Sequence, residues 1–333
     1  MLRYEWFVAA ERHLAQPDSV RVLHVLDDGN LAAALALERV ADSHGHTRYQ
    51  ILGHARLYEP TDLLYCDDSA RRLLVRAAAS LRHPVVLSRL WPHTTAVDKI
   101  TAGRRLCSHA IELTKPVAAS QYLRLEGDYD TYSRHLSSRH RYDIRRAYRR
   151  AAEIGQLAVQ LTQPGPAEVR GLLDVAFAVE ARSWKGVQGS SVVANTDLQA
   201  FFHQVLGSYA AEGYVLTALL SIDAVPAAMQ VCLVAHGKLW MLKIGYDEAF
   251  KRVSPGLILM NEVIRYAHQN SLCGIEFLGS AEAWLDVWSP ERREYRLVAL
   301  YPYTLPSLAY LGRDLTHLLL RRTRNTLFPE RGV

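Results

Sequence analysis

The stretch KIGYDEAFKRVSPGLIL, residues 243–259, decides the fold because it joins a strand end, a short basic loop and a helix start. Residues 239–244 at the beginning are apolar and aromatic, which predicts a strand. Residues 257–268 carry apolar side chains at helical spacing, which predicts an amphipathic helix. An ordinary strand–loop–helix junction needs no more than this, so the loop residues decide whether the segment is also a binding site.

The loop residues favour a phosphate site at the start of this helix. Ser254 is the expected N-cap, Pro255 suits the first helical position, and Gly256 leaves room for a ligand close to the backbone. Such a helix start presents free N–H groups and a positive dipole end to an anion. Lys251 and Arg252 add charge beside it, so the segment suits a pyrophosphate.

The neighbouring segments predict a mixed α/β fold. Residues 214–240 form three strand-like runs separated by turns, and residues 273–279 form another short strand after the helix. Residues 21–37 repeat the strand–turn–strand pattern of residues 214–231, which indicates a duplicated architecture. The order is therefore a meander, a phosphate-type loop, a helix and a further strand.

Four segments resemble a known enzyme family in their order and spacing. They are LSSRHRYDIRRAYRR at residues 136–150, EARSWKG at 180–186, the loop at 245–259, and IEFLG at 275–279 followed by Trp284 and Trp288. On these segments the chain resembles the BioF-type, cellulose-biosynthesis-associated (CelD-like) acetyltransferases, a branch of the GNAT superfamily close to the FemAB aminoacyltransferases. The resemblance is strongest over residues 120–290.

The resemblance implies tandem GNAT-like halves, as in the FemAB enzymes. We expect a degenerate N-terminal half at residues 1–125, a C-terminal acyltransferase half with the cofactor loop at 126–300, and a helical extension at 301–333. It also implies an acyl-CoA-dependent N- or O-acyltransferase that uses acetyl-CoA or another acyl-CoA and no metal. The expected acceptor is a small amine, an amino sugar or a polysaccharide precursor.

Two other functions stay open. An aminoacyl-tRNA-dependent transferase of the FemAB kind would use the same fold with a nucleic-acid carrier, although a net charge of +5 does not by itself indicate nucleic acid. A non-catalytic scaffold would keep the fold and lose acyl-CoA binding.

The expected cofactor site lies along the strand end and the helix start. Backbone N–H groups of residues 239–245 would hold the thioester carbonyl as oxyanion donors. Tyr246 is the candidate for protonating the thiolate leaving group, on its position alone. The residues expected to bind the cofactor are Ile244, Gly245, Lys251, Arg252, Ser254, Gly256 and Leu257.

The motif EARSWKG places a carboxylate, an indole and a lysine at the end of a predicted helix, residues 167–185. Glu180 and Trp184 lie four residues apart and are expected to share a face, with Lys185 to one side. Glu180 is the predicted general base for the acceptor, and Trp184 and Lys185 are expected to shape the acceptor side. The alternative is a Glu–Lys surface pair beside a core tryptophan.

Seven arginines lie between residues 134 and 150, in a segment whose apolar residues have helical spacing. This predicts an amphipathic helix with a basic face. The face is either a solvated surface, a site for an anionic partner, or a site for transfer RNA. Arg139 and Arg145, together with Arg141, match the basic motif of the family and are expected to face the substrate.

The last motif departs from the family pattern. There the strand matching residues 275–279 is usually followed by an aromatic–lysine pair, whereas this chain has Trp284 and then a leucine. The resemblance implies that a cation such as Arg292 or Arg293 takes over from the lysine, or that the substrate has changed. Further candidates for substrate binding, including two from the N-terminal half that would reach a shared cleft, are Tyr58, Asp62, Glu276 and Trp284.

The composition suits a soluble enzyme, because 333 residues with 49% hydrophobic content can build two compact domains or one large one. No apolar run approaches the ~20 residues that span a bilayer, and no signal-peptide core is found. We therefore expect a cytoplasmic monomer or homodimer with a small-molecule or saccharide acceptor. The cysteines are far apart, without metal spacing and with mostly apolar neighbours, which favours buried free thiols at Cys66, Cys107, Cys232 and Cys273.

Overall fold

The structure is a computed structural model that describes residues 3–42, 45–91 and 109–327. Of the predicted buried free thiols, Cys232 is buried, Cys66 and Cys273 are exposed, and Cys107 lies outside these residues. The chain divides into two compact units: unit 1 comprises Met1–Leu14 and Ala118–Arg293, and unit 2 comprises Ala15–Val117 and Glu294–Val333. Both units combine strands with helices, so the predicted α/β class is confirmed. Each unit draws on two separate stretches, whereas the sequence predicts consecutive segments with bounds at residues 125 and 300.

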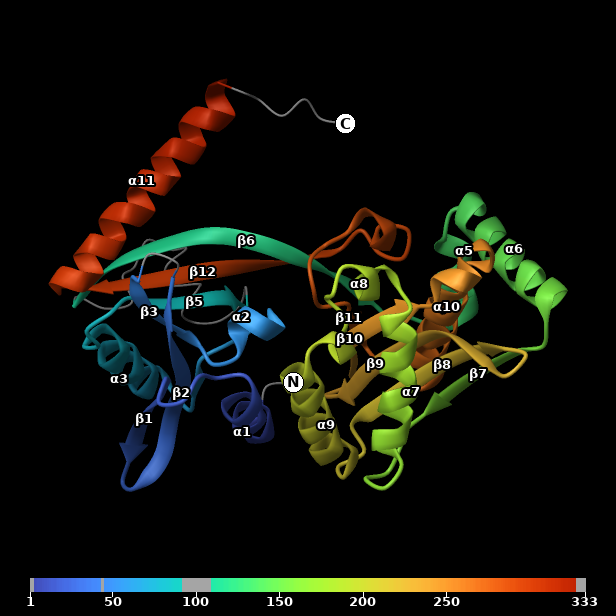
Figure 1. Ribbon diagram of the computed structural model, residues 1–333, viewed down its shortest axis with the longest axis horizontal. Helices are drawn as coiled ribbons and strands as arrows, with labels where there is room; N and C mark the ends of the chain where they lie inside the picture. Colours follow the sequence, from blue (N-terminus) through green and yellow to red (C-terminus); the bar gives the residue numbers. More distant parts are fainter. Residues whose placement is uncertain (1–2, 43–44, 92–108, 328–333) are drawn as a thin grey trace. The chain divides into compact units, whose positions relative to one another are not determined.

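Unit 1 is built on one set of strands. These are β7 (Leu157–Thr162), β8 (Val215–Ile222), β9 (Val225–Ala235), β10 (Lys238–Tyr246), β11 (Gly274–Glu276) and the last part of β6 (Ala110–Arg124). Their order is β6–β11–β10–β9–β8–β7 (Figure 1). Neighbours are antiparallel except β10 and β11, which are parallel and are joined by helix α10 (Pro255–Gln269).

Helices cover both faces of these strands. α10 and α6 (Ser138–Ile154) cover one face, where Ile144 and Ile258 join the apolar side chains of β8, β9 and β10 in one buried cluster. α7 (Val169–Ala181) and α9 (Thr196–Ala210) cover the other face, where Phe177 and Phe201 are fully buried. The remaining helices of unit 1 are α1 (Tyr4–His13), α5 (Tyr129–His135), α8 (Trp184–Val187) and three 3-10 turns at Val192–Ala194, Glu248–Val253 and Ala283–Leu285.

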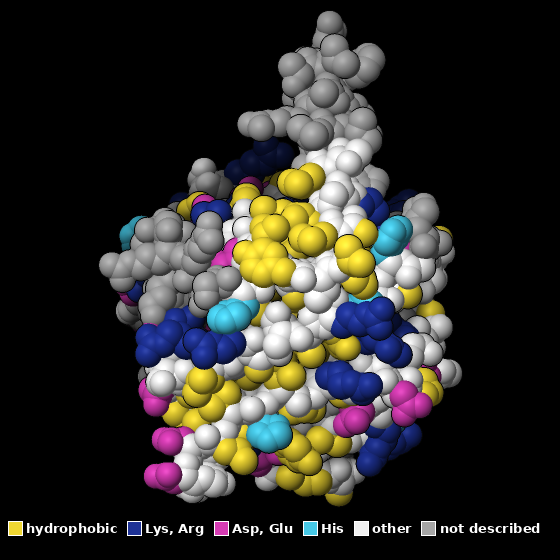
Figure 2. Space-filling view, turned by 90° about the vertical axis from the view of Figure 1, so that its left-hand side faces the viewer, with side chains coloured by type: hydrophobic (Ala, Val, Ile, Leu, Met, Phe, Trp, Pro, Cys, Tyr) yellow, Lys and Arg dark blue, Asp and Glu magenta, His cyan; other side chains and the backbone are white. Residues whose placement is uncertain are grey.

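Unit 2 contains a second set of strands in the order β1–β2–β3–β5–β12, with β4 paired to β2. The strands are β1 (Val20–Asp27), β2 (Asn30–Ala41), β3 (Thr47–Ile51), β4 (Leu64–Tyr65), β5 (Val85–Leu90) and β12 (Arg292–Pro302). The helices are α2 (His54–Leu57), α3 (Asp68–Ala79) and α11 (Leu305–Leu327), the last of which is the predicted helical extension. Figure 2 shows apolar side chains among basic ones on one face of the molecule.

The two units repeat one pattern of strand pairing. In unit 1, β8, β9 and β10 form an antiparallel meander, β11 is parallel to β10, and β6 is antiparallel to β11. In unit 2, β1, β2 and β3 form the meander, β5 is parallel to β3, and β12 is antiparallel to β5. The helix between the parallel strands is α10 in one unit and α3 in the other. The predicted tandem halves are therefore confirmed.

The repeat extends to a strained residue. Gly274 and Val85 occupy equivalent positions, because each pairs with the strand that precedes the connecting helix. Four residues further on, Leu278 has φ +56° and Arg89 has φ +54°. The left-handed conformation is uncommon for such residues and persists only where the surroundings enforce it. Both parallel strands therefore end in the same bend.

The units differ beside this bend. In unit 2, Thr61 pairs with the end of β5, because its N–H donates to the carbonyl of Arg89 (2.9 Å) and its carbonyl accepts from the N–H of Trp91 (3.2 Å). The start of α3 is capped by Asp67, whose side chain accepts from the N–H of Ala70 (2.8 Å). In unit 2 the chain itself therefore occupies the strand edge and the helix start.

We expect Gly274→Ala to destabilise the protein, because a Cβ atom there would lie 2.2 Å from the hydroxyl oxygen of Tyr122. The ring cannot yield freely, since Tyr122 is buried and its hydroxyl donates to the carbonyl of Cys273. The free energy of unfolding should fall by about 1–3 kcal/mol, as measured by denaturant titration.

The matched control is Gly171→Ala in α7, where the Cβ position is open. This change should be neutral or should stabilise the protein by about 0.5–1 kcal/mol. Equal stability of both variants would mean that β6 and β11 can move apart to accept the extra carbon.

Candidate functional site

The site is built on a strand that loses one neighbour. β10 pairs with β9 along its whole length, but β11 pairs only with Lys238, Leu239 and Trp240. The register with β9 shifts between Met241 and Lys243, which makes Leu242 a bulge residue. Bulges occur often beside active sites, where they redirect the backbone. Beyond Trp240, β10 therefore presents a strand edge that β11 does not cover.

The helix after this strand starts differently from prediction. The expected basic loop is the 3-10 turn Glu248–Val253, which carries Lys251 and Arg252 with their side chains exposed. Ser254 occupies the N-cap position of α10 but has φ +53°, and its side chain makes no capping hydrogen bond. Its carbonyl instead accepts from the N–H of Leu257 (3.0 Å). The helix start thus lacks the acidic cap that closes α3.

Gly256 keeps the approach to this helix start open. A Cβ atom at that position would meet only the ring of Tyr246, at 3.6 Å, which is an ordinary contact. The chain would therefore tolerate a side chain there, and the glycine leaves the helix start accessible from outside the chain. Burial and the neighbouring Glu248 carboxylate raise the pKa of Tyr246, so its hydroxyl stays protonated at neutral pH.

Glu180 lies at the C-terminal end of α7, and both of its carboxylate oxygens are bonded. Oε1 accepts from Nζ of Lys185 (3.0 Å), and Oε2 accepts from the N–H of Val192 (2.9 Å). Glu180 is 1% exposed, so the surface-pair interpretation is wrong. Nζ of Lys185 also donates to the carbonyl of Ile244 (2.8 Å). A Cβ atom at Gly245 would lie 3.1 Å from the Cα of Glu180, so glycine permits this close approach.

The predicted C-terminal end of the helix at residues 167–185 is wrong. α7 stops at Ala181, and α8 begins again at Trp184 with Ser183 as its N-cap, since the Ser183 hydroxyl accepts from the N–H of Lys185 (3.2 Å). Glu180 and Trp184 therefore do not share a helical face, and Trp184 is half-exposed. The pair that does form, between the carboxylate and Lys185, crosses the break between the two helices.

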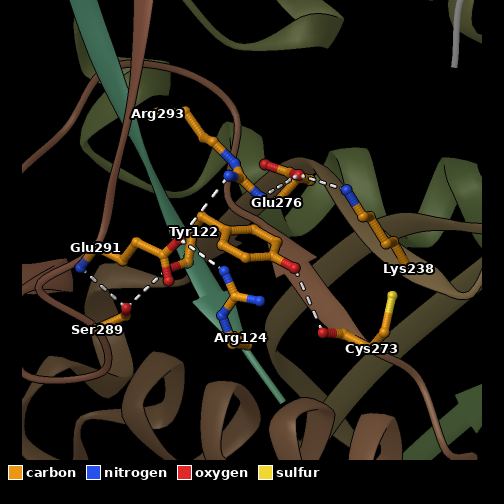
Figure 3. A network of polar contacts seen from close by, with 8 residues as sticks. All are labelled: Tyr122, Arg124, Lys238, Cys273, Glu276, Ser289, Glu291 and Arg293. Carbon is orange, nitrogen blue, oxygen red and sulfur yellow. Dashed lines mark hydrogen bonds and ion pairs between the residues drawn. The ribbon is translucent and has the colours of Figure 1, made fainter. Parts of the chain in front are cut away.

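A second carboxylate lies where β10 and β11 part. Glu276 pairs with Trp240 in the register, and it is fully buried. Its Oε1 accepts from Nζ of Lys238 (3.2 Å) and from the guanidinium of Arg293 (3.4 Å), which stacks on the ring of Tyr122 at 3.6 Å (Figure 3). Among the described residues, Oε2 of Glu276 has no hydrogen-bond partner. A buried oxygen without a partner is costly, which marks it as a position for a ligand's donor group.

The network around Glu276 also bears on the missing lysine. Of the two replacement cations that the sequence offers, Arg293 contacts the carboxylate, whereas Arg292 bonds Asp286 on an exposed site. Lys238 and Tyr122 were not among the predicted residues. Trp284, next to the missing lysine, is half-exposed and donates to the carboxylate of Glu282 (2.6 Å).

The other predicted residues belong to other elements of the chain. Arg139 and Arg145 are exposed on α6. Tyr58 and Asp62 belong to unit 2, where burial raises the pKa of Asp62 to about 6. Their contribution to a shared cleft stays a prediction. Trp288 is buried and packs edge-on against His140, with ring centres 4.4 Å apart, so it is a packing residue.

Two further searches of the described residues gave no candidates. Within residues 3–42, 45–91 and 109–327, no group of three or more histidine, cysteine, aspartate or glutamate side chains is arranged to hold a metal ion. In the same residues, no helix combines the length and the apolar character needed to cross a membrane.

Comparison with protein families identifies the part of the chain that holds this strand. Residues 138–285 match the family model described as the acetyltransferase (GNAT) domain. This match confirms the predicted enzyme class, a GNAT-type acyltransferase, for that part of the chain. It does not distinguish the BioF-type branch. No curated protein matches the sequence.

Solved structures share the fold over nearly the whole chain. The C-terminal domain of a putative lysylphosphatidylglycerol synthetase from Agrobacterium fabrum has a TM-score of 0.57 at 12% identity, covering 93% of this chain and 96% of that one. The structure of L-PGS from Bacillus licheniformis has a TM-score of 0.56 at 13% identity, with the same coverage. FemX gives 0.55 at 10%, covering 93% of this chain and 98% of that one. At these identities the likeness shows the fold alone.

We expect Lys185→Met to lower the free energy of unfolding by about 3–5 kcal/mol, because the Glu180 carboxylate would stay buried with one oxygen unpaired. The double variant Glu180→Gln/Lys185→Met should recover part of this loss, since no charge is left uncompensated. Denaturant titration of the single and double variants gives the coupling energy. A Lys185→Met protein as stable as the wild type would contradict a stabilising contribution of the Glu180–Lys185 pair.

Proposed function

We propose that this protein transfers an acyl group directly from an acyl-CoA thioester to a small amine, amino sugar or hydroxyl acceptor. The observation that carries the proposal is the edge of β10 that β11 leaves after Trp240, which leads to the start of α10, where Ser254 makes no side-chain cap. Both features lie inside the segment that matches the GNAT acetyltransferase domain. Acetyl-CoA is the simplest donor of this class.

The donor's pyrophosphate would lie at the start of α10. The helix dipole and the N–H groups of its first turn favour an anion, and Gly256 leaves the approach open. Lys251 and Arg252 are exposed on the preceding turn and can neutralise the phosphates. The ring of Tyr246 borders the same place, which supports a role in donor binding.

The thioester would lie further back along β10. The four steps from Leu242 to Tyr246 span about 13 Å, a length that an extended pantetheine arm covers from the pyrophosphate. The bulge at Leu242 turns the backbone out of its regular pairing. Backbone N–H groups there would stabilise the oxyanion that forms as the acceptor attacks.

This arrangement favours Glu276 as the general base. Glu276 is level with Trp240, two residues from the bulge, and its Oε2 has no partner among the residues that the structure describes. Glu180 adjoins Gly245, nearer the phosphate end, and both of its oxygens are bonded. In our proposal Glu180 is therefore not the general base that the sequence predicts. It holds Lys185, which in turn bonds the carbonyl of Ile244 on β10.

The chemical step needs few groups. The acceptor nitrogen or oxygen attacks the thioester carbonyl carbon, and its proton passes to Oε2 of Glu276. The new C–N or C–O bond forms as the C–S bond breaks, and the CoA thiolate leaves with the electron pair. Lys238 and Arg293 hold Oε1 of Glu276 and so orient the carboxylate. The proton then returns from Glu276 to solvent.

A pair of matched variants tests the base. Glu276→Gln should lower kcat by about 10²- to 10⁴-fold while acetyl-CoA affinity stays unchanged, and the loss should shrink at high pH, where an amine acceptor deprotonates unaided. Glu180→Gln should reduce kcat far less and should act mainly on stability. Steady-state kinetics and calorimetric titration measure both effects. The reverse pattern would restore Glu180 as the base.

Donor binding is tested at the helix start. Gly256→Val should weaken acetyl-CoA binding about tenfold or more, because its side chain would stand in front of the α10 N–H groups, whereas thermal unfolding should change little. The control Gly171→Val places the same side chain near the start of α7, where the Cβ position is also open. Isothermal titration that gives equal affinities for both variants would remove the phosphate site from α10.

A further inference from the structure

The basic helix α6 is not used by the proposed reaction. It is joined to the donor site through its C-terminal end, where the guanidinium of Arg150 donates to the carbonyl of Arg252 (3.2 Å). Figure 1 shows α6 at the outer edge of unit 1, with α5 and α10 on its inner side. Its buried residues, Ile144 and Ala147 among them, face this inner side. The outer face is therefore available to a partner.

The outer face combines an aromatic side chain with arginines. Tyr142 is 50% exposed, and at helical spacing it is surrounded by Arg139, Arg145, Arg146 and Arg149. Arg149 has a long contact with Glu153 (4.0 Å, both side chains 63% exposed). In the described part of the chain, no carboxylate pairs with Arg139, Arg145 or Arg146. Exposed pairs of this kind contribute little, so the guanidinium groups are open to another partner.

This face is larger than coenzyme A requires. Eleven residues separate Arg139 from Arg150, which corresponds to about 16 Å along the helix. The phosphates of coenzyme A, a pyrophosphate and a 3′-phosphate, would engage Lys251, Arg252 and Arg150 at the α10 end of the helix. The arginines toward Arg139 would then have no phosphate of coenzyme A beside them. The arginines around Tyr142 therefore suit an acidic partner that is attached to the phosphate at the start of α10.

The composition favours a protein over a nucleic acid. Tyrosine and arginine are the residues enriched at the energetic centres of protein interfaces, and Tyr142 stands among arginines in this way. Asp143 and Glu153 lie on the same helix and interrupt its positive charge. Separate acidic side chains of a protein can avoid these carboxylates more easily than a continuous phosphate backbone can.

We propose that the outer face of α6 docks an acidic acyl carrier protein, which presents the acyl group on a phosphopantetheine arm. The inference rests on the proposed acyl transfer. The carrier's single phosphate would occupy the start of α10, its pantetheine arm would follow β10 as in acyl-CoA, and its acidic surface would meet the arginines around Tyr142. The same thioester bond breaks, so the reaction is unchanged and only the donor differs.

The test compares two donors that share one thioester. Acetyl-CoA and an acetylated phosphopantetheinyl acyl carrier protein are offered to the wild type and to the triple variant Tyr142→Ala/Arg146→Glu/Arg149→Glu. We expect kcat/KM for the carrier protein to fall at least about tenfold, and kcat/KM for acetyl-CoA to change less than about twofold. The matched control is Arg170→Glu on α7, an exposed arginine of the same unit that should alter neither value.

The outcomes separate this inference from the proposed function. If the wild type uses neither donor, the proposed acyl transfer itself is overturned. If acetyl-CoA is used and the triple variant affects both donors equally, or if the carrier protein is not used, the docking surface is overturned while acyl transfer stands. Binding of transfer RNA that is lost in the triple variant and that weakens steeply with salt would assign the face to nucleic acid instead.

Discussion

The rest of unit 1 depends on one interruption of hydrogen bonding: β11 pairs with three residues of β10 and then departs. A strand edge without a partner is a liability in most sheets, because it invites pairing with other chains. Here the edge runs from the bulge at Leu242 to the start of α10, and the Glu180–Lys185 pair fixes its far end through the carbonyl of Ile244. The Glu180–Lys185 ion pair therefore fixes the part of β10 with which β11 does not pair.

Unit 2 shows what happens to the same architecture when the interruption is closed. Thr61 pairs beside the bend at Arg89, and Asp67 caps the helix that corresponds to α10. The bend itself survives, with nearly the same φ as at Leu278. Conservation of a strained conformation after the opening has been filled indicates that the bend belongs to the strand topology and not to ligand binding alone.

Local signals predicted where α10 begins, whereas the long-range contacts of the site were not predictable from them. Pro255 and Gly256 mark a helix start by their own conformational limits, so α10 could be placed from the sequence. The end of α7 at Ala181 was missed, although Ser183 offered an N-cap for a new helix. Lys238 is 38 residues before Glu276, and Arg293 is 17 residues after it. Separations of this length do not predict that the three side chains are in contact. The sequence offers Glu276 as a substrate-binding candidate, but its contacts with Lys238 and Arg293 became visible only when the strands were paired.

The position of β12 at the end of the strand sequence has a consequence for how the protein is made. β12, which completes unit 2, begins at Arg292, after every other strand of both units. A ribosome releases the N-terminal strands of unit 2 long before this partner emerges, and β5 must wait with one edge unpaired while all of unit 1 is synthesised. Unit 2 is thus the last to be finished, and a truncation that removes β12 would leave one edge of β5 unpaired and open to other chains.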